Sequence, residues 1–399
     1  MKILYLAGFP NEYDDNVFIQ ARKKSVISCF EESNYKIDFL YNSYAEHPLI
    51  LANAKMYYSR LLPCSVGRSF IEKIHCKLFE YSGLYSTFIL RLLEKKFNLK
   101  INSYDVIIAE SWHHLAAVLP FAKGRKIIGR IYGTSNLTER IEKNSIWKLH
   151  PFFNRIKRVI NSDKIIGIIF NSTGSRSRTL FELLSDNTEK LSPVPVYLDM
   201  PNSLFSTEKP KERLKDGTLQ LLQVGRMTDR HGFDLTIKIV ERLVKQHDIP
   251  LMVSLVGGGA LQDKIRDLIK KRGLAKYIKM PGYRSMDELK DFYAKADIVI
   301  NYYGFNPVIE ALNYKAFVIT REFGEMGKIL DKAFNRKIYR VCLTDCKVVE
   351  IEDSLKEQYV DEVVKSAVWY FNNFLQISDS DFTPKRKITS KDFAQDVFS

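Results

Sequence analysis

The chain has 399 residues, of which 45% are hydrophobic and 27% charged, and its formal net charge is +14. This length exceeds one ordinary core and suits two domains, and the apolar content excludes a disordered chain. No apolar run reaches the roughly 18–20 residues that span a bilayer, and five cysteines without a Cys-x-x-Cys pair indicate a reducing cytoplasm.

Short apolar runs alternate with helix-like segments along almost the whole chain. In the first half the expected strands are residues 3–7, 35–41, 106–109, 126–131 and 165–170. In the second half they are residues 219–224, 251–256, 278–280, 298–300 and 317–320. This alternation predicts an α/β fold with parallel sheets that helices cover on both faces.

The polar stretch 206–217 is the best candidate for a domain boundary. We therefore expect an N-terminal domain of residues 1–205, a second domain of residues 206–375, and a tail of residues 376–399 that crosses back to the first. Two doubly wound domains would face each other across a cleft, and ligands of such sheets bind beyond the carboxyl ends of the strands.

Positive charge gathers in the first half of the chain. Residues 54–100 hold nine Lys and Arg against three acids, and residues 121–165 hold eleven against three, so these blocks carry +6 and +8. Such a surface suits an anionic membrane, a nucleic acid or an anionic substrate, and it also fits a merely solvated face. Because no nucleic-acid motif accompanies the charge, we expect no nucleic-acid partner.

Residues 69–97 form a long segment of helical character, which Gly83 is expected to divide. Apolar residues recur in it at spacings of three, four and seven: Ile71, Ile74, Leu78, Tyr85, Phe88 and Leu92. Four basic residues are expected off that stripe: Lys73, Lys77, Arg91 and Lys95. A basic amphipathic helix can lie on a membrane, and an apolar stripe more often faces the core; the sequence leaves both open.

The loop after residues 219–224 carries candidate phosphate ligands. Gly225 ends the strand, Arg226 follows it, and His231 lies at the start of the next helix. A guanidinium at a strand end can bind phosphate oxygens in a bidentate way, although a surface arginine and a capping histidine fit as well. The next loop, residues 257–259, is three glycines, which suit either a closely approaching ligand or a tight turn.

A second strand end carries a carboxylate. Asn306 is a good helix N-cap and Pro307 suits a first helical position, so a helix start follows the loop 302–306. A helix start attracts anions, and Glu310 in its first turn can accept hydrogen bonds from the paired hydroxyls of a ribose. With Arg226, these features predict a site for a nucleotide diphosphate.

Two further motifs have weaker interpretations. Asp379-Ser380-Asp381 has an Asp-x-Asp pattern but lies in a polar loop away from any strand end, so we expect no metal site there. His113-His114 follows a strand and could line the cleft or simply pack against its neighbours.

At this point the chain resembles a known family, the GT-B fold glycosyltransferases of family 4 (group 1), which have two facing Rossmann-like domains. The segments "VGRMTDRHGFDL", "LVGGGALQDKIRDLIKKRGLAKYIKMPGYRSMDELKDFYAKADIVIN" and "GFNPVIEALNYKAFVIT" match the family in order and spacing and cover most of residues 220–325. The stretches "MKILYLAGFP", "YGTS" and "IIFNS" of the first half match more loosely.

The resemblance implies roles for individual residues. Arg226 looks like the family's pyrophosphate-binding arginine, Glu310 like the second glutamate of its Glu-x7-Glu motif, and His231 takes the place of its pyrophosphate lysine; these three are the expected catalytic residues. The donor-binding residues that it implies are Gly225, Gly282, Tyr283, Arg284, Tyr302, Gly304, Phe305, Asn306 and Pro307. The acceptor-side residues that it implies are Asn16, Tyr132 and Gly133.

The chain departs from the family at several of these positions. Tyr302 stands eight residues before Glu310, where the family has its first glutamate, and a shift by one brings in Tyr303 instead. Tyr132 replaces a histidine, and residues 14–16 replace a pair of glycines near the first strand. Binding of a nucleotide is therefore better supported than any particular sugar.

The resemblance implies a glycosyltransferase that retains the anomeric configuration. It would move a sugar from a nucleotide-sugar donor to a lipid-linked glycan acceptor during assembly of bacterial surface polysaccharide. No metal or other cofactor is expected, and the protein would be cytoplasmic, peripheral at the inner face of the cell membrane and in contact with its anionic surface. The alternative is a catalytically weakened GT-B subunit that binds or stabilises a partner glycosyltransferase.

Overall fold

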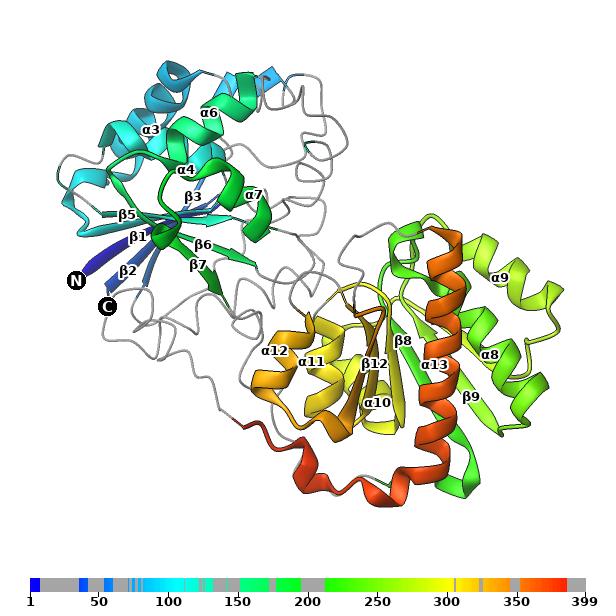
Figure 1. Ribbon diagram of the computed structural model, residues 1–399. Coiled ribbons are helices and arrows are strands. Elements are labelled where there is room, and N and C mark those ends of the chain that lie inside the picture. Colours follow the sequence, from blue (N-terminus) through cyan, green and yellow to red (C-terminus); the bar gives the residue numbers. More distant parts are fainter. Residues whose placement is uncertain are drawn as a thin grey trace. The chain divides into compact units, whose positions relative to one another are not determined.

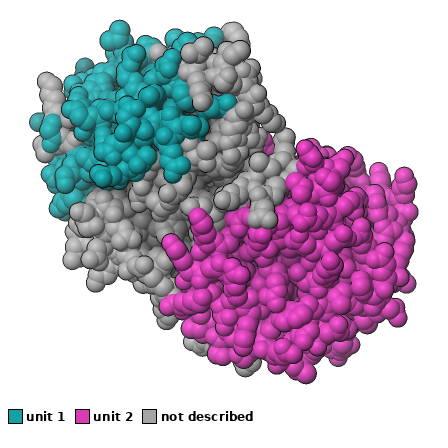
Figure 2. Space-filling model, viewed as in Figure 1, with its two compact units in different colours: residues 1–199, 388–399 teal, residues 200–387 magenta. Residues whose placement is uncertain are grey.

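The structure, a computed structural model, divides the chain into two compact units (Figures 1 and 2). Unit 1 comprises residues 1–199 and 388–399, and unit 2 comprises residues 200–387. The residues that the structure describes are 1–7, 36–41, 54–59, 71, 74–75, 78–79, 82–110, 112–121, 124, 126–131, 141, 151–171, 177–194, 212–304, 306–322, 326–344 and 352–385. Each unit is built on one parallel sheet, so the predicted α/β fold is confirmed.

Unit 1 contains a seven-stranded parallel sheet of order β3-β2-β1-β4-β5-β6-β7 (Figure 1). Its strands are β1 (Lys2–Ala7), β2 (Lys36–Tyr41), β3 (Ala54–Tyr58), β4 (Val106–Glu110), β5 (Lys126–Ile131), β6 (Ile165–Asn171) and β7 (Leu191–Val194). Its α-helices include α3 (Gly83–Phe97), α4 (Trp112–Val118), α6 (Pro151–Ile160) and α7 (Ser177–Leu184). Because α4 packs against both α3 and α6, these three helices form one layer over the sheet.

Helix α3 buries a different face from the one that its apolar spacing suggests. Ile89, Leu90 and Leu93 pack in the core of unit 1. Most of the expected stripe is exposed, including Ile71 at 77% and Phe88 at 57%. The stripe as a whole therefore does not face the core.

The exposed face of α3 combines apolar and basic side chains. Leu84, Phe88, Arg91 and Lys95 are spaced by three, four and seven positions and so share one face, which corrects the expectation that Arg91 and Lys95 lie off the stripe. Leu84 is 88% exposed. The side chains of Lys73 and Lys77 lie outside the described residues. Of the helices described here, none is both long and apolar enough to cross a membrane.

Unit 2 contains a six-stranded parallel sheet of order β10-β9-β8-β11-β12-β13 (Figure 1). Its strands are β8 (Leu219–Val224), β9 (Leu251–Val256), β10 (Ile278–Gly282), β11 (Ile298–Asn301), β12 (Phe317–Arg321) and β13 (Tyr339–Cys342). Its α-helices are α8 (Phe233–His247), α9 (Gln262–Lys271), α10 (Met286–Lys295), α11 (Asn306–Asn313), α12 (Met326–Ala333) and α13 (Asp353–Asn373). The long helix α13 packs across α8, β12 and β13.

Three strands were not expected from the sequence, and each lies at the edge of a sheet: β3, β7 and β13. Interior strands such as β4 are buried at every position and read as continuous apolar runs, whereas an edge strand tolerates polar residues and proline. Pro193 in β7 and Arg340 in β13 interrupt the apolar pattern. These three strands therefore lack an apolar pattern in the sequence because they lie at the edges of the sheets.

The loops that follow β8 and β9 approach each other through backbone alone. The N–H of Gly225 donates to Val256 O at 3.0 Å, and the N–H of Met227 donates to Gly258 O at 2.9 Å. Gly257 has φ +132°, and a Cβ on it would lie 1.9 Å from Gly225 O. The glycine loop is thus explained by close contact with a neighbouring loop, without any ligand.

Gly257→Ala should destabilise the folded protein by roughly 1–3 kcal/mol or more, because an alanine strains this φ and collides with Gly225 O. Denaturant unfolding measures the effect. Gly258→Ala is the matched control, since the nearest atom to its Cβ is the flexible Gln262 Oε1 at 3.3 Å. Equal stabilities of the two variants would contradict the packing account.

Candidate nucleotide-binding site

Arg226 stands at the carboxyl end of β8 as an exposed cation. Among the described residues it makes no ion pair, in contrast to the paired arginines of α8 and α9 such as Arg242 and Arg266. The backbone on either side of it is fixed, because Gly225 and Met227 both hydrogen-bond to the β9 loop. A guanidinium that extends from a fixed backbone at a strand end, and that has no ion pair among these residues, is suited to an anionic ligand.

His231 lies beside this arginine in a neutral form. Burial, Arg226 and Arg230 lower the pKa of His231 to about 4, so the ring is uncharged at neutral pH. Its Nδ1 lies 2.8 Å from Thr228 Oγ1, and its ring meets the Tyr303 ring edge-on at 5.7 Å. If the Thr228 hydroxyl donates to Nδ1, the remaining N–H of the imidazole is at Nε2. His231 can then offer a hydrogen bond to an anion but not a positive charge.

The loop after β10 adjoins the β9 loop from the other side. Gly257 N–H donates to Gly282 O at 2.9 Å, and Gly282 has φ +80°. Tyr283 is exposed. Arg284 donates from Nη1 to Tyr283 O at 3.2 Å and lies 3.7 Å from Glu288. The loops after β8, β9 and β10 therefore form one continuous backbone edge, to which Gly225 and Gly282 both belong.

Tyr302 is packed inside unit 2 with only 5% of its surface exposed. The Arg321 guanidinium lies 4.5 Å from its ring centre and Nη1 donates to its hydroxyl at 3.4 Å. Tyr359 of α13 meets the same ring edge-on at 5.1 Å, and a Cβ on Gly232 would lie 2.6 Å from Tyr302 Cγ. The tyrosine at the position of the family's first glutamate thus contributes to packing, and Tyr303 is the one beside His231.

The loop 302–304 is anchored at both ends. Asn301 at the end of β11 donates from Nδ2 to Gly304 O at 2.6 Å and to Thr320 Oγ1 at 3.2 Å. Gly304 has φ +112°, a conformation that favours glycine. Helix α11 then begins at Asn306, with Pro307 in its first turn. With Asn306 as the N-cap, the helix would begin at Pro307. The helix instead begins at Asn306, one residue earlier than predicted.

Glu310 is a buried carboxyl, 7% exposed, on α11. Tyr293 of α10 donates its hydroxyl to Oε2 at 2.5 Å and stacks on Tyr314. Burial raises the pKa of Glu310 from its usual 4.5 to about 7, although the hydrogen bond from Tyr293 opposes that rise. Neither Asn301 nor Tyr293 was identified from the sequence, because their roles depend on contacts with residues far along the chain.

The structure leaves some predicted residues unplaced. Phe305 and the three acceptor-side residues, Asn16, Tyr132 and Gly133, lie outside the described residues. The Asp-x-Asp motif is engaged elsewhere. Asp379 pairs with Arg213 and Lys315, each at 2.9 Å, and Asp381 Oδ2 accepts a hydrogen bond from the backbone N–H of Ser378 at 2.9 Å. In the part of the chain that the structure describes, no group of three or more His, Cys, Asp or Glu could hold a metal ion.

The two predicted histidines of unit 1 are largely buried. His114 Nδ1 lies 2.6 Å from Glu110 O, and burial lowers the pKa of His114 to about 4. Burial, His114 and Arg155 lower the pKa of His113 to about 4 as well. Both rings are therefore uncharged at neutral pH, and His114 packs rather than lining an open surface.

Glu310→Gln should remove a pH-dependent loss of stability. Because folding raises the pKa of Glu310, the protonated carboxyl contributes to the free energy of unfolding. This contribution is complete below about pH 4.5 and is lost as the pH rises through about 7. We expect the Tm of the parent, relative to that of Glu310→Gln, to fall between about pH 5 and about pH 8. Thermal denaturation of both proteins across this range measures it, and parallel Tm curves would contradict the raised pKa.

The family model described as glycosyl transferases group 1 matches residues 205–356. The uncharacterized glycosyltransferase MJ1607 of Methanocaldococcus jannaschii is 25% identical over 126 residues. That match covers 31% of this chain and 32% of MJ1607, so the chain aligns with about a third of this curated relative.

Solved structures match the chain over nearly its whole length. HepE of Anabaena, solved in complex with UDP, has 15% identity and a TM-score of 0.59, with coverage of 100% of this chain and 98% of HepE. The pneumococcal O-GlcNAc transferase GtfA, in complex with UDP and GlcNAc, has 12% identity, a TM-score of 0.59 and the same coverage. At these identities the likeness establishes the fold, which is GT-B. The match to the group 1 glycosyl transferase family model spans Arg226, His231 and Glu310.

Proposed function

We propose that the protein is a glycosyltransferase that moves a sugar from a nucleotide-sugar donor to an acceptor, with retention at the anomeric carbon. The observation that carries this proposal is the exposed Arg226, which forms no ion pair within the described part of the chain and lies beside His231 in a region that matches the group 1 glycosyl transferases. The two GT-B structures compared above were solved with UDP, which supports a nucleoside diphosphate as the leaving group.

The difficult step is departure of the nucleoside diphosphate, on which negative charge develops. Arg226 would supply the compensating charge, and neutral His231 would add a hydrogen bond without a further charge. The first turn of α11 would offer backbone N–H groups to the same phosphates. The fixed β8 and β9 loops hold Arg226 before the substrate arrives, so little reorganisation accompanies the reaction.

Glu310 would orient the donor through its sugar. Tyr293 already occupies Oε2, which leaves Oε1 to accept a hydrogen bond from a ribose hydroxyl. Because the carboxyl has a pKa of about 7, a ligand that donates to it also favours the ionised form. Glu310 thus acts as a binding group with an adjustable charge.

A second candidate function follows from Tyr302. The chain has a buried tyrosine where the family has its first glutamate, and no carboxylate occupies the neighbouring position 303 either. A weakened GT-B subunit that binds or stabilises a partner glycosyltransferase would have this feature. Turnover of a nucleotide-sugar by the purified protein alone favours the enzyme, and nucleotide binding without turnover favours the subunit.

We also propose that the acceptor is a lipid-linked glycan of bacterial surface polysaccharide and that the protein works at the inner face of the cell membrane as a peripheral protein. The observation in favour is the exposed face of α3, where Leu84 and Phe88 lie on the same side as Arg91 and Lys95. A face that is both apolar and basic suits an anionic bilayer surface.

Arg226→Ala should weaken binding of UDP and GDP by roughly ten- to a hundredfold, because a charged phosphate contact is worth about 1.5–3 kcal/mol. Isothermal titration of the folded variant measures this. Arg266→Ala, an exposed arginine on α9, is the matched control and should bind as the parent does. Unchanged affinity in Arg226→Ala would remove the assignment of the phosphate site.

Sugar transfer should proceed without a divalent metal, because Arg226 provides the charge and the Asp379-Ser380-Asp381 motif is engaged in ion pairs and capping. We expect the rate to be the same in EDTA as in magnesium or manganese. Loss of transfer in EDTA and its recovery on adding either metal would show that the proposal of metal-independence is wrong.

A further inference from the structure

Tyr293 is a buried tyrosine whose hydroxyl is held in a fixed place within unit 2. It lies on α10 with 2% of its surface exposed, and its ring stacks on that of Tyr314 with the ring centres 5.9 Å apart. Helix α10 begins at a reciprocal capping box between Ser285 and Glu288, which fixes the start of the helix. The Tyr293 hydroxyl donates to Oε2 of Glu310 at 2.5 Å. This packing therefore sets a hydrogen-bond donor against one oxygen of the carboxyl group.

Glu310 accepts this hydrogen bond in a place where no cation balances a negative charge. Its carboxyl forms no ion pair with a lysine, arginine or histidine that the structure describes. Three charged side chains of α10 act on the neighbouring Tyr314 instead: Asp287, Lys290 and Asp291. Two strands pack against α11: β11 contains no titratable residue, and Arg321 of β12 lies over the ring of Tyr302. Burial is therefore the main influence on the ionisation of Glu310, and the Tyr293 hydroxyl opposes it.

A ribose offers the donors that this carboxyl lacks. Its 2′ and 3′ hydroxyls are adjacent, and an ionised carboxylate accepts more hydrogen bonds than a protonated carboxyl, whose O–H is itself a donor. Because Tyr293 engages Oε2, the carboxyl group of Glu310 cannot rotate without breaking that bond, and the position of Oε1 is fixed as well. Donors that bind the ionised form stabilise it, so they lower the pKa of the carboxyl.

We propose that Tyr293 is a positioning residue of the donor site, which holds Glu310 so that its carboxylate accepts hydrogen bonds from the vicinal hydroxyls of a ribonucleotide. The inference rests on the proposed function, in which Glu310 contacts the ribose. It adds a second residue, from a different helix, and a proton that leaves on binding. The ribose hydroxyls keep their protons and donate to the carboxylate, and the proton of Glu310 passes to the buffer.

The first measurement counts this proton and needs no variant. UDP and its 2′,3′-dideoxy analogue are titrated calorimetrically into the full chain at about pH 7, in Pipes and in imidazole, two buffers that differ in their enthalpy of ionisation. Because the pKa of Glu310 is about 7, its carboxyl is half protonated there, and UDP should release about half a proton more than the analogue. The phosphates of both nucleotides ionise alike near pH 6, so their contribution cancels in the difference.

The second measurement follows the affinity for UDP relative to the analogue across pH. This ratio should rise between about pH 5.5 and about pH 7 and then level off. The reason is that the ribose selects the ionised carboxyl, whose fraction grows by up to about tenfold per pH unit below its pKa. A ratio that does not change with pH, or uptake of a proton when UDP binds, would overturn the proposal.

Tyr293→Phe removes the hydroxyl and keeps the ring. It should weaken binding of UDP by about five- to tenfold, the effect of one lost hydrogen bond, and leave binding of the analogue unchanged. It should also move the rise of the affinity ratio to higher pH, because the Tyr293 hydrogen bond lowers the pKa of Glu310. Glu310→Gln should remove both the extra proton and the rise. The matched control is Tyr370→Phe, a buried tyrosine on α13, which should keep the ratio and the pH profile of the parent.

A tyrosine that only supports the fold would affect both nucleotides alike. If Tyr293→Phe weakens UDP and the analogue equally, or changes neither the affinity for UDP nor its pH profile, the positioning role is wrong and the proposed function still stands. If the parent protein does not bind UDP at all, the proposed function is wrong and this inference fails with it. The two failures are therefore distinguishable within one set of titrations.

Discussion

The contact between the loops after β8 and β9 is the constraint on which the candidate site depends. The two loops share backbone hydrogen bonds through Gly225, Met227 and Gly258, and no side chain fits between them at Gly257. Arg226 is held within this contact, so its position follows from backbone geometry and not from a side-chain partner. Since Arg226 forms no ion pair with any residue that the structure describes, it can meet an anion without first breaking one of these.

Burial decides the chemistry of the residues around Arg226. His231 loses its charge because it is partly desolvated beside two arginines, and Glu310 retains its proton up to about pH 7 because it is enclosed with Tyr293. Both effects reduce the number of full charges on these two side chains. The candidate site thus combines the cation Arg226, the neutral imidazole of His231 and a carboxyl, Glu310, with a raised pKa.

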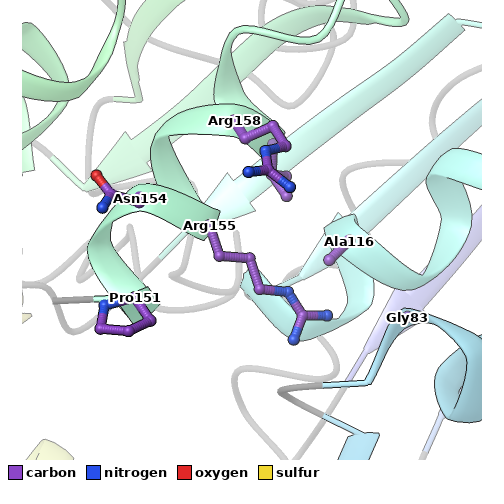
Figure 3. A pocket seen from close by; sticks show the side chains of 7 residues that line it. Gly83, Ala116, Pro151, Asn154, Arg155 and Arg158 are labelled. Atoms are coloured by element: carbon purple, nitrogen blue, oxygen red, sulfur yellow. The ribbon is translucent and has the colours of Figure 1, made fainter.

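Unit 1 presents a different kind of surface. Its helix α3 uses Ile89, Leu90 and Leu93 for the core and leaves Leu84 and Phe88 outside. Arg155 and Arg158 of α6 line a pocket together with Gly83, the first residue of that helix, and Arg155 extends toward it (Figure 3). The residues proposed to bind the donor phosphates belong to unit 2, and the helix face proposed to contact the membrane belongs to unit 1.

The sequence alone predicted the interior strands and the strand ends after which Arg226, His231 and Glu310 follow, because buried parallel strands are local apolar runs and short polar loops mark their ends. It also predicted two α/β domains of the GT-B type. The edge strands β3, β7 and β13 could not be predicted, since an edge position does not require a continuous apolar run.

Tertiary structure decided what the remaining residues do. Tyr302 is buried by Arg321 and by Tyr359 of α13, a helix more than fifty positions along the chain. Its place in the loop after β11 predicted a donor-binding residue and gave no sign of this packing. The raised pKa of Glu310 depends on enclosure with Tyr293, and the exposed face of α3 depends on which of two apolar stripes fits the core. Each of these properties depends on contacts between segments distant in sequence, and the local spacing of residues cannot predict such contacts.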